Sequence, residues 1–278
     1  MKRAQLVYLL LCIVSVTFDL KAICKMKINL HKFNKSKFKS KSFITRDFNE
    51  KKTTTNLKIE ILVESLCPYS IKFINESFAN FFHTPNSDKL AEVIIYPFGN
   101  GKQKFNETTG LYEFKCQHGI NECYGNLIQV CAMNILKNSH DSYEFLICSY
   151  SKIKEHKKDF DKNLKFCLNE LKYEEEYEEK IKECSKNKDG NRLMHLVASN
   201  YPDHKHVPWV VVNGEFDEDS SNSVIENLLE YACENSDLDE EDKGKICDSV
   251  TQRKNKTKFF ENAKIKTSEN PFNKDDIQ

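Results

Sequence analysis

The sequence predicts a single α/β domain with extensions at both ends, and three observations support this fold class. An alternating and then wholly apolar run over 57–63 is typical of a strand, and it leads through a turn into apolar residues at helical spacing. A long helical stretch follows from about 121 to 200, and an apolar strand pattern returns at 208–212. The 278 residues suffice for one such domain but not comfortably for two.

The first strand pattern runs directly into a turn that carries a cysteine. The turn covers 64–70, and apolar residues then recur at helical spacing from Ile71 to Phe82. Pro68 is well suited to the first turn of that helix. Cys67 is therefore expected at the N-terminus of a helix, where unpaired amides and the helix macrodipole favour a thiolate over a thiol.

The remaining elements follow in chain order. Residues 91–98 predict a second strand, and residues 121–200 predict several helices. The strand at 208–212 ends in an Asn-Gly turn signal. A final helix from about Ser223 to Cys233 then leads into an acidic run at 237–242, which predicts a loop.

Both ends of the chain predict segments outside the folded domain. Residues 1–22 have the pattern of a secretory signal peptide, with an apolar run that is short for a membrane span; an uncleaved anchor is the alternative. Residues 23–55 are rich in lysine and predict a flexible basic arm, with contact to a membrane surface or polyanion as the alternative. Residues 249–278 predict a polar, disordered tail. No transmembrane segment is expected after signal cleavage.

Export determines the compartment and the modifications to expect. The predicted location is the secretory pathway, with the protein secreted, on the cell surface or in a lysosome-like acidic vesicle. Four Asn-x-Ser/Thr triplets fit N-glycosylation, at Asn34, Asn75, Asn106 and Asn255. Such triplets are frequent by chance in an Asn-rich chain, so they support export only weakly.

Eleven cysteines indicate a disulfide-bonded protein, because exported chains meet oxidising conditions. Cys12 lies in the signal peptide, Cys24 in the basic arm and Cys67 in the turn. The other eight form an even set that can close into disulfides: Cys116, Cys123, Cys131, Cys148, Cys167, Cys184, Cys233 and Cys247. Their connectivity does not follow from spacing, although the last two flank the acidic run and are expected to pair. Cys67 is then the unpaired thiol of the domain.

One segment carries a long and specific motif. From Cys116 to Cys131 the sequence reads Cys-Gln-His-Gly, two residues, Glu-Cys, two residues, Asn, four residues and Cys. This pattern resembles the signature of the gamma-interferon-inducible lysosomal thiol reductase family at every fixed position. Residues 184–195 and 206–214 also resemble the family. The resemblance covers roughly Leu57 to Cys247.

The resemblance implies a thioredoxin-like sheet in a domain over 56–248, with a long disulfide-stapled helical insertion at about 116–200. Reductases of this family use a Cys-x-x-Cys pair, in which the first thiolate attacks a substrate disulfide and the second resolves the mixed disulfide. Here the segment is Cys67-Pro68-Tyr69-Ser70. Serine cannot form a disulfide, which counts against dithiol reduction by this chain alone.

One-thiol chemistry stays open to such a motif. Cys67 is expected to attack, Ser70 to donate a hydrogen bond to the thiolate, and an external thiol such as glutathione to release the product. The motif is also similar to that of single-cysteine glutaredoxins, which work with such a thiol. No resident cofactor is predicted.

The resemblance also implies a substrate-binding loop. In thioredoxin-like folds a cis proline faces the reactive cysteine, so the Val207–Pro208 bond is expected to be cis, with an ordinary trans proline as the alternative. The Val207 backbone would offer strand-like hydrogen bonds to an extended substrate. Pro68 and Tyr69 complete the expected substrate contacts.

No metal site is predicted from the sequence. By residue type, Cys116, His118 and Cys123 could hold zinc, but export favours disulfides. His118 is then expected to be a structural hydrogen-bonding residue and not a general acid or base. The acidic stretches at 174–179 and 237–242 lack the spacing of a calcium-binding EF-hand loop.

The predicted function is a secretory-pathway thiol oxidoreductase that acts on protein disulfides through Cys67. Two alternatives remain: a catalytically degenerate protein that binds or chaperones a partner, and a secreted or surface interaction protein in which Cys67 is incidental. Forty-two basic and 42 acidic residues cancel, so no overall field attracts nucleic acid, and no nucleic-acid partner is predicted.

Overall fold

The computed structural model describes residues 55–136, 138–200, 203–248 and 250. Several predicted features lie outside these residues: the signal peptide, nearly all of the basic arm and of the tail, and the glycosylation candidates Asn34 and Asn255. Within the described ranges, no helix combines the length and the apolar character needed to cross a membrane.

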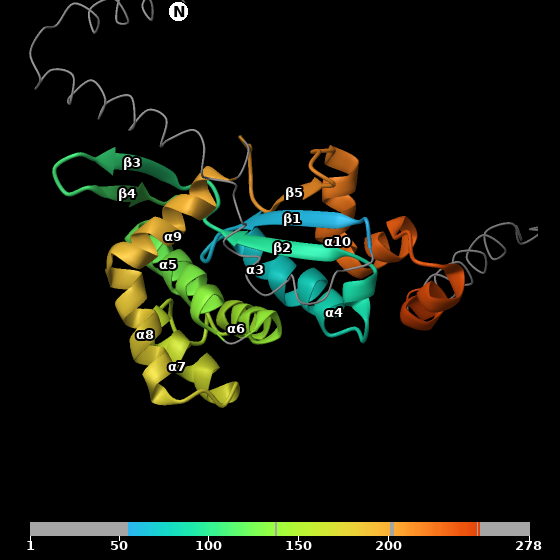
Figure 1. Cartoon of the computed structure of the whole chain (residues 1–278), viewed down its shortest axis with the longest axis horizontal. Helices are drawn as coiled ribbons and strands as arrows, with labels where there is room; N and C mark the ends of the chain where they lie inside the picture. Colours follow the sequence, from blue (N-terminus) through green and yellow to red (C-terminus); the bar gives the residue numbers. More distant parts are fainter. Residues whose placement is uncertain (1–54, 137, 201–202, 249, 251–278) are drawn as a thin grey trace, which may run out of the picture. The chain divides into compact units, whose positions relative to one another are not determined.

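A mixed three-stranded sheet in the order β2-β1-β5 lies at the centre of the described fold (Figure 1). The strands are β1 (Lys58–Val63), β2 (Glu92–Pro97) and β5 (Trp209–Val212). β1 pairs in parallel with β2 and antiparallel with β5, with Leu62 opposite Trp209. Because β1 is the middle strand, its carboxyl end lies between β2 and β5, and the turn with Cys67 follows directly.

A helical crossover connects β1 to β2, as a parallel pair requires. It consists of α3 (Pro68–Phe73), the π-helical turn η2 (Ile74–Phe78) and α4 (Ala79–Phe82), which form one continuous helical run. The short 3₁₀ helix η3 (Ser87–Lys89) precedes β2. This strand–helix–strand unit and the antiparallel β5 make the sheet thioredoxin-like, as the resemblance implied.

Helix α10 (Glu218–Asn235) packs on the crossover and bends at Asn227, whose backbone is not helical. Ser77 of η2 enters the bend. Its Oγ accepts a hydrogen bond from the N–H of Leu228 at 2.8 Å and donates one to the carbonyl of Val224 at 2.9 Å. In an undisturbed α-helix those two backbone groups would bond to each other. A side chain inserted into the helical ladder is a known cause of such bends.

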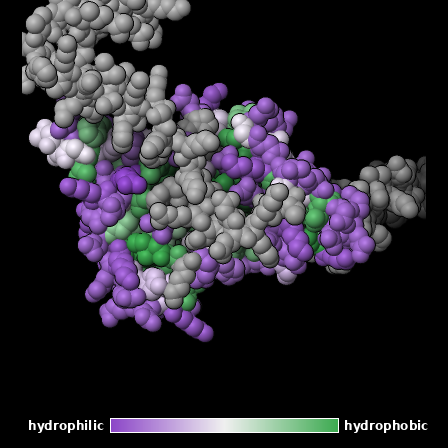
Figure 2. Space-filling model, in the orientation of Figure 1, coloured by the Kyte–Doolittle hydropathy of each residue, from purple (hydrophilic) through white to green (hydrophobic). Residues whose placement is uncertain are grey.

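The sheet and the surrounding helices enclose one apolar core. Its members include Ile59, Ile61, Val63, Phe73, Ile74, Phe78, Phe81, Ile95, Tyr143, Leu146, Val210, Val224 and Leu228. Burying one such side chain completely is worth roughly 1.5–3 kcal/mol. Tyr143 and Leu146 belong to the helical insertion, so the insertion and the sheet share this core. On the face shown in Figure 2, hydrophilic residues cover most of the described surface.

A β-hairpin that no sequence pattern predicted precedes the helical stretch. It pairs β3 (Lys102–Asn106) with β4 (Leu111–Lys115) in antiparallel fashion. Both strands are largely exposed, so neither has the apolar run by which the other strands were found. The turn is stabilised locally, because Asn106 Oδ1 accepts the N–H of Thr108 at 2.9 Å, and Gly110 adopts φ +69°.

The helical stretch consists of α5 (Ile120–Ile135), α6 (Ser139–Ser151), α7 (Phe160–Glu170), α8 (Glu175–Lys186) and α9 (Lys188–Ser199). Three breaks between these helices have a capping side chain, since Asn138, Asp159 and Asn187 accept N–H groups of the following turn. Gly190 lets α9 approach α8, because a Cβ there would lie 2.1 Å from the carbonyl oxygen of Cys184.

Four disulfides close the eight cysteines of the predicted set. The pairs are Cys116–Cys123, Cys131–Cys184, Cys148–Cys167 and Cys233–Cys247. Two of them join helices of the insertion, α5 to α8 and α6 to α7. The acidic run is not wholly a loop as predicted, because residues 240–248 are helical. Asp239 begins that helix by accepting the N–H of Asp242 at 3.0 Å.

Candidate active site

Cys67 lies where β1 gives way to the helical run, and Pro68 occupies the first helical position. The turn is closed by backbone bonds on both sides of the cysteine: its N–H reaches the carbonyl of Glu64 at 3.4 Å, and its carbonyl accepts the N–H of Ile71 at 2.9 Å. Cys67 is a free cysteine. Its side chain is buried, with 5% exposure, whereas the nearby Tyr69 is 74% exposed.

The loop before β5 faces the thiol. The Val207–Pro208 peptide bond is cis, and Cys67 Sγ lies 3.8 Å from the carbonyl oxygen of Val207, within hydrogen-bonding reach for sulfur. Because a thiol is a weak donor and a carbonyl only accepts, the S–H points at the loop. The two chain segments that the resemblance paired therefore meet at the sulfur atom.

A groove of about 720 Å³ opens beside this contact. Its lining comes from the helical run, from the loop before β5 and from α10: Tyr69, Lys72, Phe73, Glu76, His206, Val207, Pro208, Asn222, Ile225 and Glu226. Three of the four predicted substrate contacts, Tyr69, Val207 and Pro208, lie in it. The lining thus combines apolar and aromatic side chains with the charged Lys72, Glu76 and Glu226.

Ser70 does not make the contact that was expected of it. Its side chain is completely buried, and its Oγ accepts the backbone N–H of Glu64 at 3.2 Å. Within the described residues no hydrogen bond joins Ser70 to Cys67. The reason is that the end of β1 leaves a buried N–H unpaired, and the serine oxygen satisfies it. Ser70 therefore stabilises the turn.

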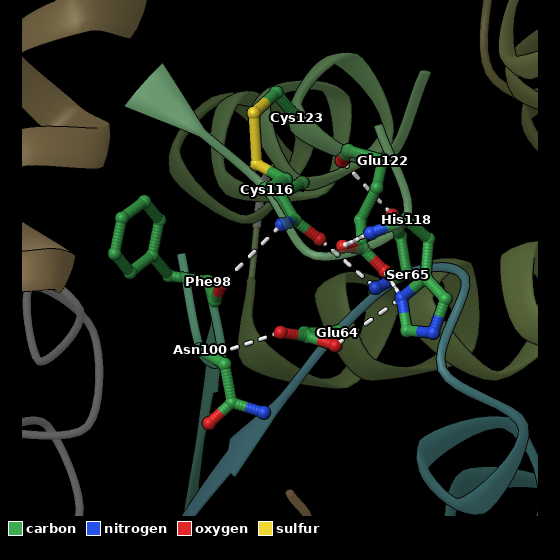
Figure 3. The surroundings of a disulfide bond; sticks show 9 residues. Glu64, Ser65, Phe98, Asn100, Cys116, His118, Glu122 and Cys123 are labelled. Atoms are coloured by element: carbon green, nitrogen blue, oxygen red, sulfur yellow. Dashed lines mark hydrogen bonds and ion pairs between the residues drawn. A yellow bond between two sulfur atoms is a disulfide. The ribbon is translucent and has the colours of Figure 1, made fainter. Parts of the chain in front are cut away.

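The signature segment at the start of α5 holds the same turn from another side (Figure 3). Asn126 Oδ1 accepts the N–H of Ser65 at 2.9 Å, and its amide nitrogen lies 3.5 Å from the carbonyl of Phe98. The hydroxyl of Ser65 donates to the carbonyl of Glu122 at 3.1 Å. Ser65 follows β1, Phe98 follows β2, and Glu122 and Asn126 lie in α5, so the signature links the turn to both neighbours.

Two completely buried carboxylates and one imidazole lie next to this network (Figure 3). Glu122 Oε1 accepts the backbone N–H of His118 at 2.8 Å, and its Oε2 lies 2.5 Å from His118 Nδ1. Glu64 Oε1 accepts the N–H of Asn100 at 2.6 Å, and its Oε2 lies 3.5 Å from the same imidazole nitrogen. Burial raises the pKa of Glu64 to about 7; the charge of Glu122 adds to this effect, and the bond from Asn100 and the nearby His118 oppose it.

Tyr150 of α6 is another buried polar residue near the thiol. Burial raises the pKa of its hydroxyl well above 10, and the nearby Cys67 adds to this shift, as do Glu64 and Glu122 more weakly. Glu64 was expected in the same turn as Cys67 but without a role, and Asn126 and Tyr150 were not expected near it. The available signal for Glu64 was its position, because an acidic residue directly follows an apolar strand there and begins the turn.

The other predicted sites have clear structural contexts. Cys116 and Cys123 are bonded to each other, so the zinc site considered for them with His118 has no thiolate ligands. Asn75 lies in η2, and Ser77 of its triplet is buried against α10. Asn106 lies at the β3–β4 turn, where a glycan has more room.

Comparisons with known proteins give consistent matches. The sequence model of the family described as "Gamma interferon inducible lysosomal thiol reductase (GILT)" matches residues 58–171. A protein of that name from Carassius auratus is 27% identical over 179 residues, which cover 63% of this chain and 66% of that protein. The Mus musculus protein is 28% identical over 183 residues, 64% of this chain and 67% of its own length. A reductase-like protein of Anopheles gambiae is 29% identical over 192 residues, which cover 65% of this chain and 77% of that protein.

Among solved structures, the chain is similar to the MdbA protein, a thiol-disulfide oxidoreductase from Actinomyces oris. The two share 11% sequence identity with a TM-score of 0.44, over 65% of this chain and 82% of that one. The chain thus spans about two thirds of the length of the two vertebrate relatives.

Proposed function

The chain belongs to the gamma interferon inducible lysosomal thiol reductase family, and on that premise we propose that it is a thiol oxidoreductase that acts on protein disulfides through the single thiol of Cys67. The observation that carries this proposal is the contact between Cys67 Sγ and the carbonyl of Val207 at 3.8 Å. It places a free thiol against a loop that borders an open groove.

In the first step the Cys67 thiolate attacks one sulfur of a substrate disulfide. A bond forms between Cys67 Sγ and that sulfur, the substrate S–S bond breaks, and the second substrate sulfur leaves as a thiolate that takes up a proton. Cys67 must lose its own proton beforehand. The extended substrate would lie along Val207, as in other cases of strand-like peptide recognition.

An external thiol, such as glutathione, completes the reaction. Its thiolate attacks Cys67 Sγ, which releases the substrate as a second thiol and leaves Cys67 in a disulfide with the external thiol. A second external thiol then attacks that disulfide and regenerates Cys67. Two external thiols are oxidised to one disulfide, and one substrate disulfide is reduced to two thiols, so the electrons balance. Ser70 takes no part in the electron transfer.

The proposed location is the secretory pathway, ending outside the cell, at its surface or in an acidic vesicle. Four disulfides support an oxidising compartment. The apolar run near the N-terminus supports entry into that pathway. Of the two glycosylation candidates within the described residues, Asn106 fits a glycan better, because Glu107 and Thr108 of its triplet are exposed whereas Ser77 of the Asn75 triplet is buried.

A non-catalytic binding function is the second candidate, and one observation favours it. Cys67 is only 5% exposed and lacks a resolving cysteine, so a mixed disulfide formed there would be long-lived. The groove could then hold or chaperone a partner. A secreted interaction protein in which Cys67 is incidental is the remaining alternative.

The test is the reduction of a denatured, disulfide-bonded protein by glutathione at acidic and at neutral pH. Wild type should accelerate the reaction, and Cys67→Ala should return the rate to that of glutathione alone, because no other described cysteine is free. Cys24→Ala, in the basic arm, is the matched control and should behave as wild type. Equal rates for wild type and Cys67→Ala would reject catalysis, and retention of a partner by the wild type alone would then support binding.

A further inference from the structure

Glu64, His118 and Glu122 form a cluster whose chemistry the thiol reaction does not use. Glu64 follows β1, His118 lies just before α5, and Glu122 lies in its first turn. Their potential ligand atoms all lie within 4.8 Å of one another, which holds for no other group of three His, Cys, Asp or Glu side chains in the described part of the chain. Figure 3 shows the carboxylates of Glu64 and Glu122 approaching the same nitrogen of the His118 imidazole.

Each carboxylate is held by one oxygen and presents the other to the imidazole. The Oε1 atom of Glu64 accepts the N–H of Asn100, and the Oε1 atom of Glu122 accepts the N–H of His118. Both Oε2 atoms point toward His118 Nδ1, at 3.5 Å for Glu64 and 2.5 Å for Glu122. Backbone N–H groups thus hold the two carboxylates. Three potential metal-ligand atoms from two distant parts of the sequence converge as a result.

The imidazole of His118 is the one basic side chain that pairs with the two carboxylates in the described part of the chain. Both carboxylates have completely buried side chains, and within the described residues neither pairs with a lysine or arginine. His118 Nδ1 can donate at most one hydrogen bond, and its shorter contact is with Glu122. Glu64 Oε2 is a completely buried oxygen with no hydrogen-bond donor among the described residues. A buried carboxylate oxygen without a hydrogen bond is costly, and a proton or a cation at this position would satisfy it.

We propose that Glu64, His118 and Glu122 bind a zinc ion through His118 Nδ1 and the Oε2 atom of each glutamate, with water as the fourth ligand. Zinc bonds to nitrogen and oxygen of about 2.0–2.1 Å in a tetrahedral site separate the ligand atoms by about 3.3 Å. The spacing of 3.5 Å between Glu64 and His118 already fits. The Glu122 contact of 2.5 Å must open by roughly 1 Å to reach this separation, because the ion would then lie between the two atoms.

The donor set favours zinc over the common hard cations. Calcium and magnesium prefer oxygen ligands throughout, whereas zinc readily takes an imidazole with carboxylates. His118 has 33% side-chain exposure, so the ion can enter from solvent along the imidazole. The Asn100 and His118 N–H groups would act as outer-sphere supports that orient the carboxylates. The ion would link the end of β1 to α5 and would carry no electrons in the proposed thiol reaction.

The experiment measures zinc binding by the full chain, freed of metal with a chelator, in competition with a chromophoric chelator at neutral pH. Wild type, which has all three proposed ligands, should bind one zinc ion per chain. Glu64→Gln keeps the shape of the side chain but removes its charge, and His118→Ala removes the nitrogen ligand. Each should lower the affinity for zinc at least about 100-fold, because loss of even an outer-sphere hydrogen-bond partner lowers metal affinity roughly 10- to 100-fold.

Two control variants identify the ligands. His83→Ala removes an exposed imidazole that pairs with Glu144 at 3.1 Å, and it should bind zinc as wild type does. Cys67→Ala should do the same, because the thiol is not a proposed ligand. The proposal is overturned if wild type binds no zinc, or if folded Glu64→Gln and His118→Ala bind zinc as wild type does. Neither result depends on whether the protein reduces disulfides.

Discussion

At the scale of single residues, position 70 decides whether the turn can form its own disulfide. Positions 67 and 70 are three residues apart at the start of one helical run, a spacing that places side chains on the same face. Ser70→Cys should therefore form a bond to Cys67 when treated with oxidised glutathione. The intact mass should fall by two hydrogen atoms relative to the reduced variant, and substrate should no longer accumulate as a mixed disulfide.

The matched control for this prediction is Ser70→Ala. It removes the oxygen that accepts the Glu64 N–H but adds no thiol, so Cys67 should remain free after the same treatment. A Ser70→Cys protein that stays a dithiol, or forms only glutathione adducts, would contradict the prediction. That outcome would mean that the buried side chain at position 70 cannot turn toward Cys67.

The contacts of Cys67 could be anticipated from sequence, but those of its neighbours could not. The Cys67 turn and the Val207–Pro208 loop stand out because a local motif and a family resemblance mark them. Glu64 meets His118 only through the tertiary fold, and nothing in their spacing reveals the contact. Ser70 was assigned to the thiolate because of its position in the motif, yet the unpaired N–H at the strand end determined its actual partner.

At the scale of elements, the bend of α10 depends on Ser77. Ser77→Ala should lower the free energy of unfolding by about 1–3 kcal/mol, because it leaves the buried N–H of Leu228 and carbonyl of Val224 without a partner. Urea unfolding followed by circular dichroism would measure the change. Ser223→Ala is the control on the same helix, since that exposed serine bonds only to Asp219.

The control variant should change stability by no more than about 0.5 kcal/mol, as is usual for surface substitutions. If Ser77→Ala is equally mild, the two backbone groups must re-form a regular helical bond when the serine oxygen is removed. The bend would then be a consequence of packing, and Ser77 would only adapt to it.

Elements with an apolar face were predictable, and exposed or interrupted elements were not. Residues 57–63 and 208–212 were found because they enter the core. The β3–β4 hairpin was missed, because its strands pack little and its Asn106 turn has no long apolar run beside it. The interruption of α10 also escaped prediction, since it arises from a serine that lies far away in sequence.

At the scale of the whole molecule, the disulfides stabilise the fold to different extents. In the chain-entropy view, a cross-link stabilises more when it closes a longer loop of the unfolded chain. Cys131–Cys184 closes a separation of 53 residues, whereas Cys116–Cys123 closes one of 7. In this view the cross-link that closes the longer loop stabilises the folded state by about 4 kcal/mol, and the one that closes the shorter loop by about 2.5 kcal/mol. The long loop also contains Cys148–Cys167, so it encloses α6 and α7.

Replacing both cysteines of one pair with alanine should therefore cost more stability at 131 and 184 than at 116 and 123. Urea unfolding of the two double variants under non-reducing conditions would compare them directly. Cys116 and Cys123 flank His118 and Glu122 in the sequence. Removing this disulfide should therefore disturb the contacts of His118 and Glu122 while changing the free energy of unfolding less. The reverse order of stability would show that Cys116–Cys123 stabilises mainly by holding native contacts, and chain entropy would then not explain the role of these disulfides.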